Sequence, residues 1–322
     1  MTTPNPFIDL DLETPVDLPH RDRFPAAGHY WSEPEKLALI FAFAARRPLL
    51  VRGEAGSGKS QIARAAAQHL KSGEPLVEVI HPRFEALDLL YRIDVVERLA
   101  DAQIKQLDET NQKYVKKGRL WQAVEKMNSR QDLIPVLLVD EIDKADADLP
   151  NALLDVLGNR SFEVPSRDQP VRAPDQRWPL IIITTNEERE LPPAFIRRCA
   201  VLNLNPPEDD GEFKDWLIDR GRVHKHLKIC RDARQAAAEQ VWEDRKAAEV
   251  AGYPKVGLAE YIDLLTALHE LTRDMSDEKL RWQSQIGWLQ KLSAYALVKH
   301  ASQKQDREPV AAVTTVEPAD PQ

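Results

Sequence analysis

The chain has 322 residues, of which 43% are hydrophobic, and carries a net charge of −8. This length allows a sizeable buried core and two subdomains, and the absence of any run of about 18 apolar residues argues against a membrane-spanning helix. The acidic balance counts against a surface that binds duplex nucleic acid, although a basic patch in the pore of an oligomer would escape this argument. Two cysteines build no disulfide framework, and the first residues lack the features of a secretory signal, so we expect a cytoplasmic protein.

The first 45 residues divide into an arm and a helix. Residues 1–30 are rich in proline and poor in periodic apolar positions, which indicates an arm rather than a domain. From Glu33 to Ala45 the apolar spacing predicts a buried helix, with Leu37, Leu39, Ile40, Phe41 and Phe43 as its apolar residues.

Residues 31–206 alternate between short apolar runs and helical stretches. Interior strands are expected at residues 48–52, 76–81, 134–139, 180–185 and near 201–204, with helices at 61–70 and around 122–127. This alternation predicts an α/β subdomain in which helices flank a parallel sheet. Residues from about 94 to 118 are polar, charged and helix-prone, and form an expected helical insertion.

The pattern changes after Pro206 and Pro207. Residues 207–300 show only helical periodicity and predict an all-α subdomain, for example through Leu258, Tyr261 and Leu265. Residues 301–322 are rich in proline, alanine, valine and threonine and are expected to be disordered.

A phosphate-binding loop follows the first interior strand. The match to G-x-x-x-x-G-K-[ST] is formed by Gly53, Glu54, Ala55, Gly56, Ser57, Gly58, Lys59 and Ser60. Its glycines allow backbone N–H groups to curl around phosphate oxygens, and the next helix directs its positive end at the same anion. Lys59 is expected to reach the β- and γ-phosphates, and the Ser60 hydroxyl to ligate Mg²⁺.

A pair of carboxylates ends the third apolar run. Asp140 and Glu141 follow residues 136–139, which places them at the carboxyl edge of an interior strand. We expect Asp140 to hold Mg²⁺, directly or through water, and Glu141 to polarise the attacking water. An N-K-x-D base-reading motif is missing after Asn186, which favours ATP over GTP. Asp143 and Asp146 are expected to cap or charge the helix that follows.

Four motifs in succession resemble those of the MoxR group of AAA+ ATPases. The resemblance spans roughly residues 30–300 and is carried by residues 118–123 (GRLWQA), 140–145 (DEIDKA), 182–187 (IITTNE) and 190–199 (ELPPAFIRRC). It implies a P-loop AAA+ core with a C-terminal helical lid, with Asn186 as the sensor-1 residue that contacts the attacking water or γ-phosphate. It also implies an arginine finger that enters the neighbouring protomer's site, Arg198 first and Arg197 second. Lys255 stands near the position of the lid's sensor-2 arginine.

The resemblance implies a ring, expected to be hexameric, in which ATP hydrolysis drives chaperone-like remodelling of a protein client. Von Willebrand factor A domain proteins are common partners of this group. Two alternatives remain open at this point. The first is a nucleic-acid motor or a subunit of a restriction or defence system, and the second is a nucleotide-dependent assembly switch that does not hydrolyse ATP. An intact Glu141, Asn186 and arginine finger argue against the second, and the acidity of the chain argues against the first.

Overall fold

The computed structural model describes residues 4–21, 24–130, 132–146, 148–173 and 177–296. The chain divides into two compact units, Met1–Pro206 and Pro207–Gln322. The tail predicted to be disordered, residues 301–322, lies outside the described residues. Within those residues, helices that combine the length and the hydropathy needed to cross a membrane are absent.

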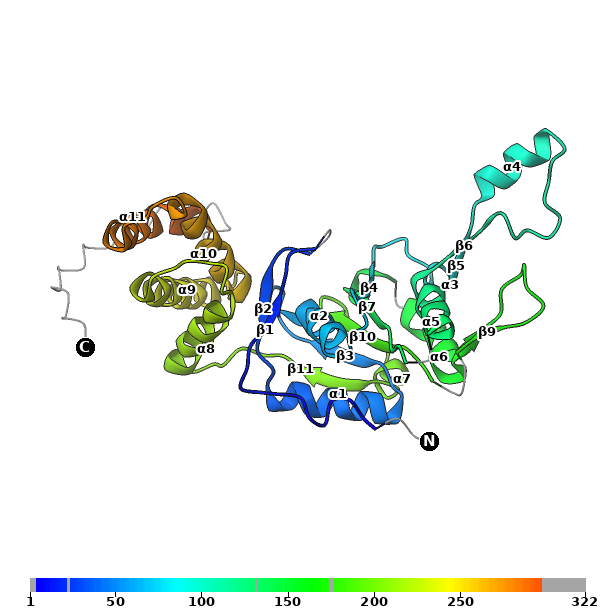
Figure 1. Ribbon diagram of the computed structural model, residues 1–322, viewed down its shortest axis with the longest axis horizontal. Coiled ribbons are helices and arrows are strands. Elements are labelled where there is room, and N and C mark those ends of the chain that lie inside the picture. The colour runs from blue at the N-terminus through cyan, green and yellow to red at the C-terminus, as the bar shows by residue number, and fades with distance from the viewer. Residues whose placement is uncertain (1–3, 22–23, 131, 147, 174–176, 297–322) are drawn as a thin grey trace. The chain divides into compact units, whose positions relative to one another are not determined.

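A five-stranded parallel sheet forms the centre of the first unit (Figure 1). Its strands lie in the order β11, β3, β10, β7, β4, with bounds Ala200–Asn203, Leu49–Arg52, Leu180–Thr185, Val136–Asp140 and Leu76–Val79. Every neighbouring pair is parallel. The α/β fold with a parallel sheet flanked by helices, predicted from alternating apolar and helical segments, is confirmed.

Successive residues of each strand point to opposite faces of the sheet, and each face has its own core. On one face Leu49, Val51, Leu138 and Ile182 pack with helices α1 (Glu33–Ala45) and α2 (Lys59–His69). On the other face the alternate residues pack against a second set of helices, α3 (Ala86–Leu90), α5 (Arg119–Ser129), α6 (Asp148–Asn159) and α7 (Pro193–Ile196). Because both faces are covered, the strands read as continuous apolar runs.

The N-terminal arm takes part in the core. Its short antiparallel strands β1 (Val16–Leu18) and β2 (Ala27–His29) pair with each other, and Phe7, Leu10 and Trp31 are buried with α1 and α2. Helix α1 itself is buried on one face only. Leu39 is fully buried, whereas Leu37 and Phe41, one helical turn apart, are exposed, which differs from the expected burial of all its apolar residues.

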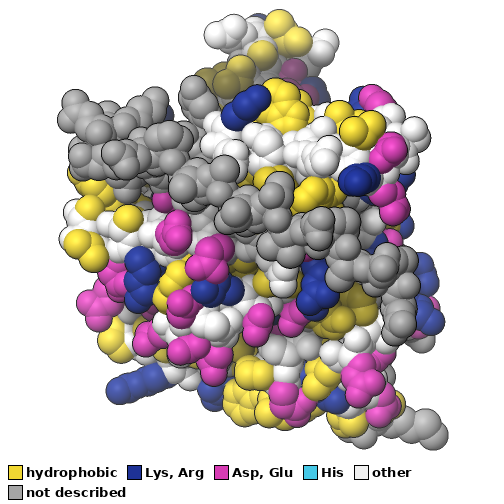
Figure 2. Space-filling view, turned by 90° about the vertical axis from the view of Figure 1, so that its left-hand side faces the viewer, with side chains coloured by type: hydrophobic (Ala, Val, Ile, Leu, Met, Phe, Trp, Pro, Cys, Tyr) yellow, Lys and Arg dark blue, Asp and Glu magenta, His cyan; other side chains and the backbone are white. Residues whose placement is uncertain are grey.

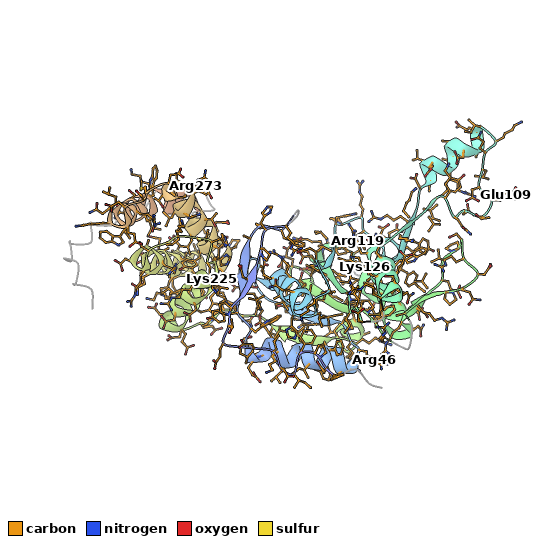
Figure 3. The ribbon with its side chains drawn as sticks, in the orientation of Figure 1. Arg46, Glu109, Arg119, Lys126, Lys225 and Arg273 are labelled. Carbon is orange, nitrogen blue, oxygen red and sulfur yellow. The ribbon has the colours of Figure 1, made fainter. Side chains whose placement is uncertain are left out.

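The insertion is a two-stranded ribbon that carries one helix away from the sheet (Figure 1). Strands β5 (Tyr91–Ile93) and β6 (Val115–Lys117) are antiparallel, and α4 (Val95–Gln103) lies between them in the chain, followed by a loop that holds Glu109 (Figure 3). The inner side of the insertion is polar, since the buried Tyr114 hydroxyl donates to Asp101 Oδ2 at 2.8 Å. A further two-stranded ribbon pairs β8 (Ser161–Phe162) with β9 (Val171–Arg172), and a 3₁₀ turn, η1 (Ile142–Lys144), follows β7.

The second unit contains four helices among its described residues, α8 (Asp210–Val223), α9 (Arg231–Ala251), α10 (Leu258–Thr272) and α11 (Glu278–Ala296). They share a core in which Phe213, Leu217, Val241, Tyr261 and Leu265 are fully buried. The predicted C-terminal all-α subdomain is therefore confirmed. On the face of this unit that Figure 2 presents, acidic and basic side chains are interspersed among apolar ones.

Candidate nucleotide site

The phosphate-binding loop joins the carboxyl end of β3 to the start of α2. Gly58 is the N-cap of α2 and has φ 93°, a left-handed conformation that glycine adopts without steric cost. Gly53 is required for a different reason, because a Cβ atom at this position would lie 2.4 Å from the carbonyl oxygen of Leu204. The loop therefore passes directly beside the chain that leaves β11, and a side chain at its first position would push the two apart.

Lys59 lies inside this loop and is buried. Its Nζ donates to the carbonyl oxygens of Gly53 at 2.9 Å and Glu54 at 2.6 Å, so the ammonium is held by the loop's own backbone. Burial lowers the pKa of the Lys59 ammonium. This shift is opposed by the nearby carboxylates of Asp140, Asp143, Glu141 and Glu54. These carboxylates favour the positive charge, which is the form that an anionic phosphate attracts.

Ser60 and Asp140 meet across the gap between α2 and β7. The Ser60 hydroxyl donates to Asp140 Oδ1 at 2.9 Å, although the two residues are 80 positions apart in the sequence. The expected Mg²⁺ ligands are therefore brought together. A hydroxyl and a carboxylate are both hard oxygen donors, the type that Mg²⁺ prefers, so the side chains present here fit this ion.

Glu141 and Asn186 extend this group of side chains along the edge of the sheet. Glu141 has φ 60°, a left-handed conformation that costs a non-glycine residue about 1–3 kcal/mol. Its Oε1 lies 3.4 Å from Nδ2 of Asn186, the first residue beyond β10. The carboxyl ends of β3, β7 and β10 thus bring together Lys59, Asp140, Glu141 and Asn186, all of which were singled out from the sequence.

Asp143 was expected to cap or charge the helix that follows, and it is an acidic residue in the first turn of the 3₁₀ helix η1. Its carboxylate also binds backbone groups. The residue is 2% exposed, and its Oδ2 accepts the backbone N–H groups of Asn186 at 3.2 Å and Glu188 at 2.9 Å. Asp143 therefore ties the end of β7 to the end of β10. Asp146 contacts Arg189 at 3.4 Å and supplies a carbonyl to the N–H of Leu149. The sequence offered no signal for the role of Asp143, because its partners are backbone groups more than 40 residues away.

Thr184 is a second residue of the site that sequence reasoning missed. It is fully buried in β10, and its hydroxyl donates to Asp140 Oδ1 at 2.6 Å while accepting the N–H of Glu141 at 2.9 Å. A threonine in an apolar strand suggests only β-propensity when it is read in the sequence. Its contact with Asp140 depends on which strand lies next to β10.

Arg197 and Arg198 lie at the amino-terminal ends of the parallel strands, whereas the loop lies at their carboxyl ends. They precede β11, and β11 runs parallel to β3 with Ala200 beside Leu49 and Asn203 beside Arg52. The loop begins after Arg52, so about four residues of strand, roughly 13 Å, separate the two ends. Both arginines are exposed, and the Arg197 carbonyl accepts from Arg47, the residue after Arg46 at the end of α1 (Figure 3).

Lys255 belongs to the second unit, in the segment between α9 and α10. Its Nζ pairs with Glu249 Oε1 at 2.7 Å, and this contact lowers the pKa of the Glu249 carboxyl. Within its unit, Lys255 thus forms an exposed ion pair at the end of α9.

Comparisons with known proteins concern mainly the first unit. Residues 48–199 match the family model of the AAA domain, dynein-related subfamily. A stretch of 140 residues is 32% identical to Chaperone protein ClpB 1 of Nostoc sp., over 42% of this chain and 13% of that protein. Two structures of NtrX from Brucella abortus are similar at 16% identity. The one in complex with ADP has a TM-score of 0.45, with 78% of this chain and 51% of that chain covered, and the other has a TM-score of 0.40, with 73% and 50% covered.

Proposed function

We propose that this chain, whose α/β unit has the AAA+ fold, binds ATP with Mg²⁺ and hydrolyses it in a homo-oligomeric ring. The observation that carries the proposal is the joined set of side chains at the carboxyl edge of the sheet. Ser60 is hydrogen-bonded to Asp140, and Glu141 lies beside Asn186. Lys59 is held within the adjacent loop by its bond to the Gly53 carbonyl. The family match at residues 48–199 supports the ATPase assignment.

Each residue has a role that follows from its chemistry and position. The N–H groups of residues 53–58 and the first turn of α2 bind the phosphates, and Lys59 offsets their charge. Ser60 and Asp140 would hold Mg²⁺, and the bound ion would supply positive charge beside the phosphate oxygens. Glu141 takes up the proton of the attacking water, and Asn186 orients that water or the γ-phosphate.

A second protomer is needed to complete this site. A guanidinium stabilises charge on the transferring phosphoryl group, and Arg198, with Arg197 as the second candidate, is the proposed source. Their place at the opposite end of the strands supports action on a neighbour, because neither side chain can span its own sheet to the loop that follows Arg52. A closed ring, which we propose is a hexamer, gives every loop such a neighbour. Sensor 2 remains a proposed role for Lys255.

The proposed use of the energy is the remodelling of a client protein, as in the MoxR group, with von Willebrand factor A domain proteins as candidate partners. The insertion supports a protein client. Its polar side faces inward, and its apolar side chains are exposed, with Val96 at 80%, Ile104 at 61% and Leu99 at 59%. Exposed apolar side chains that lie together on a projecting element are typical of a contact site and support this proposal.

Removal of the loop ammonium tests the nucleotide site. Lys59→Ala should abolish ATP hydrolysis and weaken ATP binding by at least about 100-fold, because the β- and γ-phosphates lose their nearest cation. Fluorescent ATP titration and phosphate release measure the two effects. Lys71→Ala, in the exposed turn that follows the same helix, is the matched control and should behave like wild type. Equal ATP affinity in the Lys59→Ala and Lys71→Ala variants would remove the assignment of the loop.

The client role is tested at the insertion. A Glu141→Gln protein that retains ATP serves as bait, and the same bait with Val96→Asp and Leu99→Asp serves as its pair. We expect an ATP-dependent client that binds the first bait and is lost from the second, because charges at these positions oppose apolar contact. Substitutions of Glu97 and Lys116, which pair with each other at 3.1 Å on the polar side of the insertion, serve as controls and should leave client binding unchanged. A client retained equally by both baits would place its binding site elsewhere.

A further inference from the structure

Thr184 connects the carboxylate of Asp140 to the backbone of Glu141 through a single hydroxyl. It lies at the centre of the sheet on β10, which is flanked by β3, the strand before the loop, and by β7, the strand that ends in Asp140. The Thr184 hydroxyl donates a hydrogen bond to Asp140 Oδ1 at 2.6 Å and accepts one from the N–H of Glu141 at 2.9 Å. A hydroxyl has one proton to donate and lone pairs to accept, so both bonds coexist.

The bond to Glu141 holds a strained backbone. Glu141 has φ 60° and ψ 50°, a conformation that persists only where the surroundings enforce it. Thr184 contributes the acceptor for its N–H, and relaxation to an ordinary φ would turn the Glu141 side chain away from Asn186, which now lies 3.4 Å from it. Because Asn186 follows Thr184 by two residues, the same strand end fixes both partners of this contact.

The bond to Asp140 orients the proposed Mg²⁺ ligand. Asp140 Oδ1 receives hydrogen bonds from Ser60 at 2.9 Å and Thr184 at 2.6 Å, so two hydroxyls on different elements determine how this carboxylate is turned. Thr184 is fully buried, so bulk water does not reach Asp140 at this position to donate in place of the hydroxyl.

We infer that Thr184 is a positioning residue for ATP hydrolysis: its hydroxyl sets the orientation of Asp140 and the backbone conformation of Glu141 together. The inference rests on the proposed function, since it concerns how the same site is arranged. Thr184 itself is buried and acts through the Asp140 carboxylate and the Glu141 backbone. Its removal should therefore slow turnover much more than it weakens nucleotide binding, which depends on the loop and on Lys59.

The test compares Thr184→Val with Thr184→Ser. Valine keeps the shape and loses the hydroxyl, whereas serine keeps the hydroxyl. For Thr184→Val we expect a fall in kcat of about 10- to 100-fold, as for other misplaced catalytic groups, with the ATP affinity without Mg²⁺ within about 3-fold of wild type. The Mg²⁺ concentration for half-maximal activity should rise. Thr184→Ser should recover kcat to within about 3-fold of wild type.

Thr185→Val controls for the cost of replacing a buried threonine. Thr185 is 1% exposed, and its hydroxyl accepts only from Glu187 N–H among the hydrogen bonds described, at 2.9 Å. Its variant should lose similar stability in a thermal melt and keep kcat within about 3-fold. If Thr184→Val does not fold, Thr184→Ala is compared with Thr184→Ser in its place.

The outcomes separate this inference from the function on which it rests. Wild-type kcat in Thr184→Val, or a serine variant as slow as the valine variant, would overturn the role of the hydroxyl while leaving the ATPase intact. A wild-type protein that hydrolyses no ATP, or hydrolyses it equally well after Lys59→Ala, would instead overturn the proposed function.

Discussion

At the scale of single residues, the site combines burial, charge and backbone strain in a small space. Burial lowers the pKa of the Lys59 ammonium, and the nearby carboxylates oppose that shift. Glu141 and Glu187 are both left-handed glutamates, and they follow neighbouring strands, β7 and β10. Only Glu141 has its carboxylate beside Asn186, whereas Glu187 lies 3.6 Å from Arg52 and is exposed.

Neutralising Glu141 separates binding from hydrolysis. Glu141→Gln should bind ATP with wild-type affinity and lose about 100-fold or more in kcat, because an amide has the same size and takes up no proton. Glu187→Gln makes the same chemical change in the same backbone conformation and should retain activity within about 3-fold. Single-turnover hydrolysis measures both. Turnover by Glu141→Gln at the wild-type rate would rule out its role as the base.

At the scale of elements, the helices of the second unit depend on how closely they approach one another. Gly221 of α8 faces α10, and a Cβ atom there would lie 2.9 Å from Tyr261 Cε1 and 3.0 Å from Leu265 Cδ1. Gly211, in the first turn of the same helix, has room, since its Cβ would meet only Asp209 Oδ1, at 3.4 Å. The ring of Tyr261 is fully buried and its hydroxyl donates to the carbonyl oxygen of Arg234 at 3.1 Å, so the ring has little freedom to move aside.

These two glycines predict opposite effects of one substitution. Gly221→Ala should lower the free energy of unfolding by about 1–3 kcal/mol, because the added methyl forces α8 and α10 apart. Gly211→Ala should raise it by up to about 1 kcal/mol, because alanine costs less conformational entropy in a helix. Urea unfolding, followed by tryptophan fluorescence, compares the two. Equal stability of both variants would mean that the close contact at Gly221 carries no steric cost.

At the scale of the whole molecule, the position of the arginines supports the proposed action between neighbouring chains. Arg198 and the loop lie at opposite ends of the strands of one sheet, so the proposed finger and the proposed phosphate site of a single protomer remain apart. In the proposed closed ring, each protomer would present its arginines to the loop of a neighbour. The exposed residues Leu37 and Phe41 on α1, and the exposed apolar residues of the insertion, are additional surfaces of the first unit available for contacts in an assembly.

Complementation between two inactive variants tests this arrangement. Arg198→Ala protomers retain Lys59, and Lys59→Ala protomers retain Arg198, so mixtures should recover hydrolysis at the interfaces that combine the two intact groups. Equal mixing is expected to restore up to about a quarter of wild-type activity if assembly is random and sites act independently. Arg222→Ala, which removes an exposed arginine paired with Asp219, should be active by itself. Inactivity in every mixture, with rings still formed, would show that the finger does not act between subunits.

The sequence by itself determined the fold class and most of the proposed site. Continuous apolar runs identified strands buried on both faces, and the loop required glycines at fixed spacing, so local chemistry was sufficient for both. The carboxylates Asp140 and Glu141 were found in the same way, because they end a buried strand. All of these signals lie within a few consecutive residues.

Only the tertiary structure decided how distant segments meet. The strand order places β10 between β3 and β7, and this alone gives Thr184 its contact with Asp140 and brings Asp143 to the backbone of Asn186. The pairing of β11 with β3 puts Arg198 at the opposite end of the strands from the loop, and the packing of α1 leaves Leu37 and Phe41 outside the core. These contacts join residues about 40 or more positions apart, and local sequence patterns do not specify which strand pairs with which.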